Sequence, residues 1–166
     1  KYGHSFKKNI RAVFKATRTH FAGCAAIMDF LPPIREQRKN IQYLTPEEAG
    51  RLKSVLDAPD SGLCLRERAM VRLLMYTGLR ACDVAALRLE DIDWSKDIIR
   101  IVQQKTSAPL TLPLRAVVGN ALYDYIVKER PHCDTREVFV SKFPHHRRLG
   151  AGSIGGAINA VYDAAG

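Results

Sequence analysis

The chain has 166 residues, 46% of them hydrophobic, which is enough to bury the core of one domain plus part of another. No run of about 18 apolar residues occurs, so a membrane-spanning helix is not expected. The net charge is +9, and residues 1–45 carry most of the excess, with nine Lys or Arg and two Asp or Glu. This asymmetry suggests a polyanionic partner, with nucleic acid as the first candidate, although a solvated basic helix face explains the charge equally well.

The four cysteines, Cys24, Cys64, Cys82 and Cys133, are widely spaced and form no Cys-x-x-Cys pair. This usage predicts reduced thiols in a cytosolic protein rather than a disulfide framework. His20 and Cys24 have the i, i+4 spacing of a metal-binding pair, but no second pair of ligands follows. We therefore expect no metal site.

The first segment, residues 5–30, has apolar side chains at helical spacing and predicts one helix. Pro32 and Pro33 end it, and residues 31–44 predict a linker because they show little periodicity. Five cations share the predicted helix with the apolar side chains: Lys7, Lys8, Arg11, Lys15 and Arg18.

Residues 45–57 predict a helix that opens with Thr, Pro, Glu and Glu. In such an opening the threonine caps the helix, the proline takes the first helical position and a glutamate closes a capping box. A second helix over residues 65–76 ends before Gly78, which permits a sharp turn. A short helix over residues 80–87 follows, and residues 93–97 predict a turn.

The rest of the chain mixes strands and helices. Residues 98–103 are rich in β-branched side chains, and residues 110–114 alternate apolar and polar positions, so both predict strands joined by a hairpin tip. The remaining predicted elements are a helix around 118–126, a short strand at 138–140 and a last helix around 154–162. This order predicts an α+β protein with a small antiparallel sheet.

Arg80 is the residue with the most informative surroundings, because a helix ends, a glycine turns the chain and the arginine opens the next helix. A guanidinium in that position can grip two oxygens of a phosphate, beside the positive end of a helix. Asp83 lies three residues on and has the spacing to orient it. Two other interpretations stay open: a surface arginine paired with Asp83, and a DNA-binding helix-turn-helix over residues 67–89.

Residues 77–93, TGLRACDVAALRLEDID, closely resemble the first arginine box of the tyrosine recombinases, the phage integrase family. The resemblance extends in order and spacing over about residues 41–166. Its further matches are Leu44-Thr45-Pro46-Glu47-Glu48-Ala49, Gln104-Lys105-Thr106, Leu112-Pro113-Leu114 and Val138-Phe139-Val140-Ser141. The resemblance implies a mainly helical catalytic domain with a small three-stranded antiparallel sheet over residues 45–166. Residues 1–30 would then end a helical core-binding domain that clamps DNA, with 31–44 as the linker.

The resemblance also implies a mechanism. Proteins of this family cut a DNA strand through a tyrosine, which leaves a 3′-phosphotyrosine and a free 5′-hydroxyl, with no metal or cofactor. Arg80 would hold the non-bridging phosphate oxygens, Lys105 would protonate the leaving 5′-oxygen, and Asp83 would support them. Further candidate DNA contacts are Lys7, Lys8, Arg11, Lys15, Arg18, Thr106, Arg115, Arg147 and Arg148.

The family pattern has a His-x-x-Arg box and the nucleophilic tyrosine after the last predicted helix, and the present sequence contains neither there. We therefore expect a C-terminally incomplete chain that does not cleave DNA alone. For the complete protein we expect double-stranded DNA as partner, homo-oligomers on DNA, and a cytoplasmic, nucleoid-associated location without membrane contact. Two alternatives remain, a non-catalytic helix-turn-helix module and a degenerate recombinase that only binds or assembles.

Overall fold

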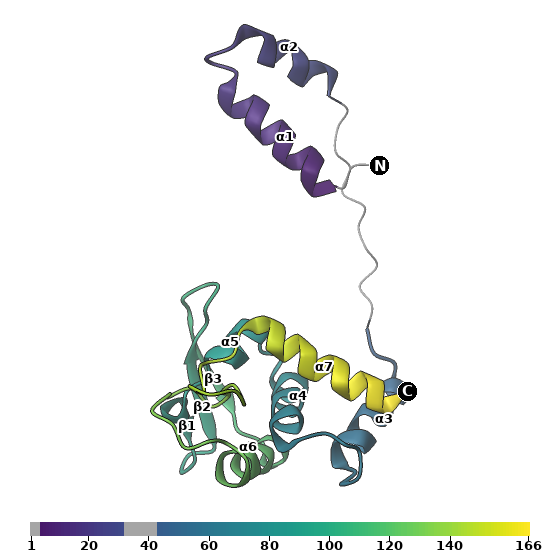
Figure 1. Ribbon diagram of the computed structural model, residues 1–166, viewed down its shortest axis with the longest axis vertical. Helices are drawn as coiled ribbons and strands as arrows, with labels where there is room; N and C mark the ends of the chain where they lie inside the picture. Colours follow the sequence, from purple (N-terminus) through teal and green to yellow (C-terminus); the bar gives the residue numbers. More distant parts are fainter. Residues whose placement is uncertain (1–3, 32–42) are drawn as a thin grey trace. The chain divides into compact units, whose positions relative to one another are not determined.

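The computed structural model describes residues 4–31 and 43–166. The chain divides into two compact units, residues 1–43 and 44–166 (Figure 1). The predicted linker, residues 31–44, lies almost entirely outside the described residues. Each unit is therefore described by itself.

The first unit consists of two helices, α1 (His4–Thr17) and α2 (Ala22–Phe30). The prediction of one helix over residues 5–30 is wrong, because the chain turns between Thr17 and Phe21. The Thr17 hydroxyl donates to the Val13 carbonyl, and the Thr17 carbonyl accepts from the backbone N–H groups of the turn. Threonine is a weak helix former for this reason, and the turn brings α2 alongside α1.

The second unit begins with α3 (Pro46–Asp57), whose start is the predicted capping box. The Thr45 backbone N–H donates to Glu48 Oε2 at 2.7 Å, and the Glu48 N–H donates to Thr45 Oγ1 at 3.2 Å. The hydrogen bonds from Thr45 lower the pKa of the Glu48 carboxyl below its usual range. This local signal places the first residue of α3 as the sequence predicted.

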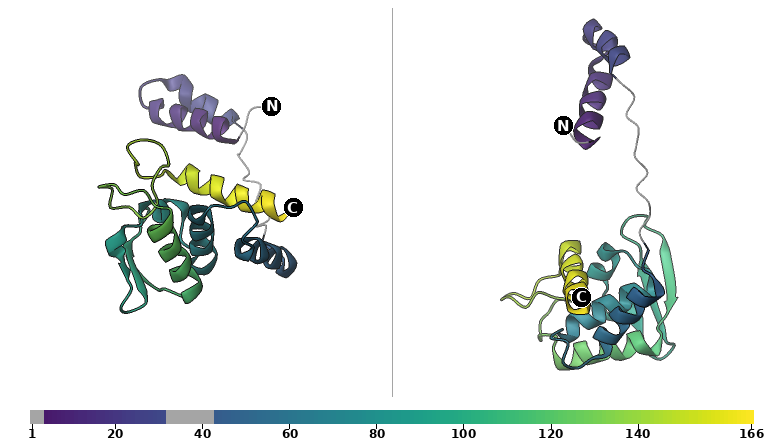
Figure 2. Two further views of the ribbon diagram at one scale, coloured as in Figure 1. Left: turned by 60° about the horizontal axis from the view of Figure 1, so that its bottom comes forward. Right: turned by 90° about the vertical axis from the view of Figure 1, so that its right-hand side faces the viewer.

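The centre of the second unit is α4 (Leu65–Thr77), which packs against α6 (Ala116–Lys128) and α7 (Ala151–Ala165), as the two rotated views confirm (Figure 2). Helix α5 (Ala81–Ala86) follows α4 and also packs on α7. Burial of large apolar side chains stabilises this arrangement, by about 1.5–3 kcal/mol for each one fully removed from water. The largest buried side chains include Leu56, Met70, Leu73, Leu122, Tyr125, Phe139 and Ile154.

The sheet has three antiparallel strands in the order β1 (Ile92–Asp93), β2 (Ile98–Val102) and β3 (Pro109–Pro113), preceded by a 3₁₀ turn at Leu89–Asp91. In the middle of β2, Ile99 and Ile101 are buried while Arg100 is exposed. This alternation places one face of the sheet on the core. The predicted α+β class with a small three-stranded antiparallel sheet is confirmed.

One strand was assigned to the wrong residues. Val138, Phe139 and Val140 are fully buried, yet they form no strand, and isolated bridges pair only Glu137 with Arg88 and Val140 with Arg148. The third strand is instead β1, which lies just before the predicted turn. A short apolar run predicts that its side chains are buried more reliably than it predicts a strand, because an irregular segment can bury the same side chains.

The start of α4 is held by charged groups that are almost fully bonded. The Arg68 guanidinium, 9% exposed, donates to the carbonyls of Leu56, Ala58, Pro59 and Leu63 and to the Ser61 hydroxyl. Across the helix end, Glu129 Oε2 accepts from the Leu65 N–H at 2.7 Å. A carboxylate at a helix N-terminus satisfies an orphan donor and complements the helix dipole. These contacts fix α4 against the α3–α4 loop and the end of α6.

Three further properties of the described residues bear on the predictions. All four cysteines are free and half-buried. Across residues 4–31 and 43–166, no group of three or more His, Cys, Asp or Glu side chains is arranged to hold a metal ion. None of the helices in these ranges is both long and apolar enough to cross a membrane.

Candidate active site

The candidate site begins at the turn that joins α4 to α5. Gly78 ends α4 with a φ of 66°, a left-handed conformation that glycine adopts without strain, and its N–H donates to the Leu74 carbonyl. Leu79 is buried, and its N–H donates to the Thr77 hydroxyl at 3.3 Å. The turn is therefore fixed on both sides of the glycine, and the next residue, Arg80, has a defined backbone position.

Arg80 occupies the N-cap of α5, and its carbonyl accepts from the N–H groups of Asp83 and Val84. Its side chain is exposed and makes no hydrogen bond or ion pair with any part of the chain that the structure describes. The backbone of Arg80 is thus fixed by hydrogen bonds, while its guanidinium is exposed and available to bind a ligand. Such a group can donate two parallel hydrogen bonds to a phosphate without first breaking an internal contact.

Asp83 has a different partner from the one expected. Its side chain is 2% exposed, and Oδ1 accepts from the backbone N–H of Gln104 at 2.8 Å, 21 residues along the chain. The Cys82 thiol is a weak second contact at 3.9 Å, and Oδ2 is buried without a hydrogen-bond partner. Asp83 therefore ties α5 to the loop after β2, whereas no ion pair between Asp83 and Arg80 is present among the described residues.

That loop is the turn between β2 and β3, and its third residue is Lys105. Gln103 closes the turn, because its N–H donates to the Ala108 carbonyl at 2.9 Å and its carbonyl accepts from Ser107 at 2.8 Å. Lys105 is exposed and has no partner among the described residues. The turn of this hairpin lies on the same side of the unit as α5 (Figure 1). One hydrogen bond, from the Gln104 backbone N–H to the Asp83 side chain, thus connects the first turn of α5 to the turn that carries Lys105.

The other candidate contacts lie at several places. Arg115 is the exposed N-cap residue of α6, and the Thr106 hydroxyl donates to Gln103 Oε1 at 2.8 Å. Arg147 and Arg148 are exposed in the loop before α7, where the Arg147 carbonyl accepts from Ser141. The basic side chains Lys7, Lys8, Arg11 and Lys15 of α1, and Arg18 after it, belong to the first unit. Their contacts with DNA, and the catalytic roles of Arg80 and Lys105, stay predictions.

The helix-turn-helix alternative fits this geometry poorly. Its second helix would be α5, which has six residues, and three of them, Asp83, Val84 and Ala85, are buried. A recognition helix has to present a row of exposed side chains to the bases of a DNA groove. Helix α5 instead presents its N-terminal turn and buries its body.

Sequence reasoning did not identify Gln103 or the Gln104 N–H as parts of this site. Gln103 accepts a hydrogen bond through its side-chain amide, and glutamine is too common a residue to mark a site by itself. The Gln104 group is a backbone N–H, which every residue except proline has, so residue identity does not reveal it. The only available signal was the position of Gln104 directly before Lys105.

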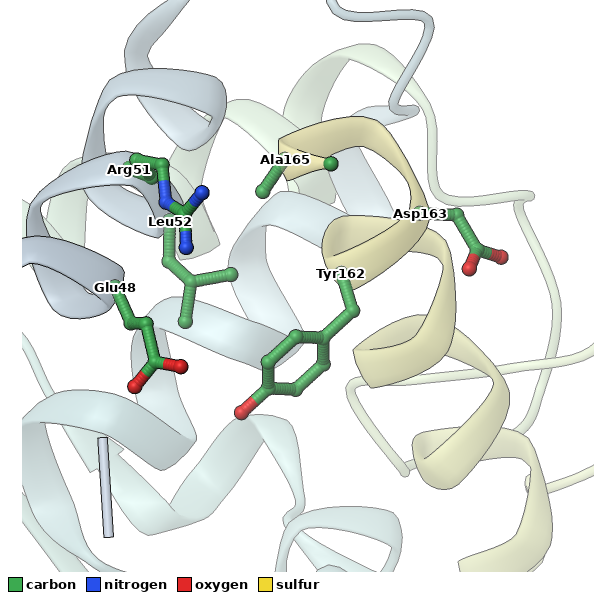
Figure 3. A pocket seen from close by; sticks show the side chains of 7 residues that line it. Glu48, Arg51, Leu52, Tyr162, Asp163 and Ala165 are labelled. Carbon is green, nitrogen blue, oxygen red and sulfur yellow. The ribbon is translucent and has the colours of Figure 1, made fainter. Parts of the chain in front are cut away.

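Two pockets of the second unit lie away from these residues. The larger, about 440 Å³, lies between α3 and the end of α7 and is lined by Arg51 and Tyr162 among others (Figure 3). The smaller, about 360 Å³, lies at the start of α4 beside Glu129 and Lys142. Neither contains Arg80, Asp83 or Lys105. A DNA strand needs an open basic surface rather than an enclosed pocket, so the absence of these residues from both pockets is compatible with the candidate site.

The chain belongs to the phage integrase family, because the sequence profile of that family matches residues 42–166. This confirms the resemblance identified from the arginine box. The match includes the turn with Arg80 and the hairpin with Lys105, and it excludes α1 and α2.

Individual relatives agree with this assignment. Over 85 residues the chain is 41% identical to the putative integrase/recombinase y4gC of Sinorhizobium fredii (strain NBRC 101917 / NGR234), covering 51% of this chain and 44% of that protein. It is 31% identical over 99 residues to the tyrosine recombinase XerC of Shewanella amazonensis (strain ATCC BAA-1098 / SB2B), covering 59% of this chain and 32% of XerC.

Solved structures show the same fold. XerA recombinase matches with a TM-score of 0.62 and 26% identity over 81% of this chain and 45% of XerA. A lambda integrase tetramer bound to a Holliday junction matches with a TM-score of 0.66 over 96% of this chain and 46% of that one. Its identity of 17% supports the fold alone. The chain spans less than half the length of each of these four relatives.

Proposed function

We propose that the complete protein is a tyrosine recombinase that breaks and rejoins DNA strands at specific sites. The observation that carries this proposal is the Asp83–Gln104 hydrogen bond, which ties α5, whose N-cap residue is the exposed Arg80, to the turn that carries the exposed Lys105. Membership of the phage integrase family supports it. Both cations are free of internal partners among the described residues, as expected for groups that receive a phosphate.

In the proposed reaction, a tyrosine hydroxyl loses its proton to water and its oxygen attacks the scissile phosphorus. A bond forms between the tyrosine oxygen and the 3′-phosphate, and the bond from phosphorus to the 5′-oxygen breaks. Arg80 binds the non-bridging oxygens, whose negative charge grows in the transition state. Lys105 gives its proton to the leaving 5′-oxygen, so that a 5′-hydroxyl is released. Attack by a 5′-hydroxyl on the phosphotyrosine reverses the steps and reseals the strand.

None of the tyrosines that the structure describes fits the nucleophile. Tyr125 is buried against Phe139, and burial raises the pKa of its hydroxyl. Tyr76 is half-buried in α4, and Tyr162 lines the pocket between α3 and the end of α7. Tyr123 packs edge-on against Trp94, and Tyr43 is exposed before α3. We therefore assign the role of the nucleophile to none of these tyrosines.

The proposed substrate is double-stranded DNA. Residues 1–30 would act as part of a core-binding unit that clamps the duplex, and residues 45–166 as the catalytic unit. The solved lambda integrase complexes include dimers and tetramers bound to DNA, which supports a homo-oligomer on DNA and a nucleoid-associated location. The proposed phosphate contacts are Lys7, Lys8, Arg11, Lys15, Arg18, Arg115, Arg147 and Arg148.

The direct test is covalent attachment to a DNA substrate that carries a nick beside the scissile phosphate, which traps the protein–DNA adduct. We expect the complete protein to form an adduct that survives denaturation, and Arg80→Ala to slow its formation by about 10²–10³-fold while DNA affinity changes little. Arg51→Ala is the matched control, because Arg51 is an exposed arginine of the same unit on α3. Attachment at an undiminished rate in Arg80→Ala would remove Arg80 from the mechanism, and no attachment by the wild type would favour a degenerate recombinase.

Lys105 is tested with a substrate in which sulfur replaces the leaving 5′-oxygen, because a thiolate leaves without being protonated. Lys105→Ala should cleave the ordinary substrate slowly and the sulfur substrate at close to the wild-type rate. If the sulfur substrate does not restore the rate, Lys105 is not the general acid.

A further inference from the structure

The turn between β2 and β3 contains a second set of contacts that the proposed reaction does not yet use. All of them converge on Gln103, whose N–H and carbonyl bond to Ala108 and Ser107 and whose side-chain Oε1 accepts from the Thr106 hydroxyl at 2.8 Å. Ser107 has a φ of 53°, in the left-handed region that a serine rarely adopts. The turn therefore holds an unfavourable backbone conformation, and the bonds to Gln103 offset its cost.

We propose that Gln103 and Thr106 are positioning residues, which hold the turn in the conformation that presents Lys105 to the leaving oxygen. This inference rests on the proposed function. Lys105 lies between Gln103 and Thr106 in the chain, so the side-chain hydrogen bond closes a small ring around it. Breaking that bond removes the side-chain contact that spans the lysine, while the backbone bonds of Gln103 and the Gln104–Asp83 bond remain.

The chemistry of the pair suits this role. A hydroxyl has one proton to donate, and that of Thr106 is directed at Gln103, so it is not available to a phosphate. The amide oxygen of Gln103 is a neutral acceptor, which can hold the Thr106 hydroxyl without forming an ion pair with the neighbouring ammonium group. A carboxylate at residue 103 would attract Lys105 electrostatically and keep it from the DNA. The glutamine thus fixes the turn and leaves the lysine free.

The test compares five variants of the complete protein in single-turnover cleavage. Thr106→Val removes the donor, Gln103→Met removes the acceptor, and the double variant removes both. Thr106→Ser keeps the hydroxyl, and Thr111→Val on β3 is the matched control, since Thr111 is exposed on the neighbouring strand. Each variant is measured with the ordinary substrate and with the 5′-sulfur substrate, and its DNA affinity is measured separately.

We expect both single variants and the double variant to lose about threefold to tenfold in rate on the ordinary substrate, which is the range of one net hydrogen bond. The losses should not add, because both changes remove the same bond. They should disappear on the sulfur substrate, and DNA affinity should stay unchanged. Thr106→Ser and Thr111→Val should cleave both substrates as the wild type does.

Several outcomes would overturn the inference. Weaker DNA binding in Thr106→Val but not in Gln103→Met would mean that Thr106 contacts a phosphate instead. Equal losses on both substrates would indicate a general structural effect that does not act through Lys105, and wild-type rates in all variants would show that the bond has no role. Failure of the proposed function is distinguishable, because then the wild type itself would cleave neither substrate.

Discussion

The two ends of α4 use arginine in opposite ways. At its start, Arg68 is buried and donates five hydrogen bonds to the end of α3 and to the loop that follows it. Just past its end, Arg80 is exposed and has no partner within residues 4–31 and 43–166. The same side chain therefore serves the fold where its donors are satisfied and is available to a ligand where they are not.

The difference between the two arginines is tested most directly by replacing each of them separately and measuring stability. Arg68→Met should lower the free energy of unfolding by about 3–5 kcal/mol, because four backbone carbonyls lose a charged donor in a largely buried place. Arg80→Met should change it by less than about 0.5 kcal/mol. Denaturant unfolding of the two variants measures both, and a similar loss in the two would contradict the division of roles.

A smaller effect is expected from removing the Asp83–Gln104 hydrogen bond, which lies beyond the C-terminal end of α4. Asp83→Ala removes the acceptor of the Gln104 N–H, which should cost about 1–3 kcal/mol. It should also accelerate amide hydrogen exchange at Gln104, which reports whether the two turns stay connected.

Asp83→Asn is the matched control, since its amide oxygen can still accept from Gln104. Slow exchange at Gln104 in Asp83→Ala would show that another group holds the lysine turn.

The comparison extends to the first unit, where Lys7 and Lys8 are exposed on α1. If they contact phosphates, the double variant Lys7→Ala/Lys8→Ala should reduce the slope of log affinity against log salt concentration by about two. Titrations of a DNA fragment at several salt concentrations measure this slope. The same substitution at Lys53, an exposed lysine of α3, should leave the slope unchanged, and an unchanged slope in the Lys7/Lys8 variant would remove both residues from the interface.

The smallest effect is expected for the pH dependence of stability that the hydrogen-bonded carboxylate of Asp93 contributes. Hydrogen bonds from Ser95 and Arg100 lower the pKa of Asp93 from 3.8 to about 2. Because the folded-state pKa is the lower one, the stabilisation is complete above pH 3.8 and disappears as the pH falls through about 2. Asp93→Asn should therefore be less stable than the wild type near neutral pH, with the difference vanishing in strong acid. A difference that persists at the lowest pH would assign the effect to something other than ionisation.

Much of the fold could be predicted from the sequence, because its signals are local. The capping box at Thr45, the glycine turn at Gly78 and the alternation in β2 each involve a few consecutive residues. The helix break after Thr17 was missed, since no glycine or proline marks it. The prediction of a strand at Val138–Val140 was wrong, because the irregular path of this buried run depends on residues far away.

The candidate site could be predicted only in part, for the same reason. Arg80 and Lys105 were singled out by the motifs around them, and the structure tests their placement rather than their roles. The partner of Asp83 could not be found from spacing, because an aspartate three residues after an arginine predicts a local pair. Its actual partner is a backbone group 21 residues away.

The bond between Glu129 and the start of α4 also has a consequence for how the protein is made. The two residues that it joins, Leu65 and Glu129, are 64 positions apart. The local capping box of α4, in which Glu67 accepts from the Cys64 N–H, is complete as soon as the helix is made. During synthesis at roughly 5–20 residues per second, however, α4 leaves the ribosome several seconds before Glu129 does. In that interval the helix lacks both the Glu129 carboxylate and its packing against α6. The arginine turn at its far end then acquires a fixed position only after most of the second unit has been translated.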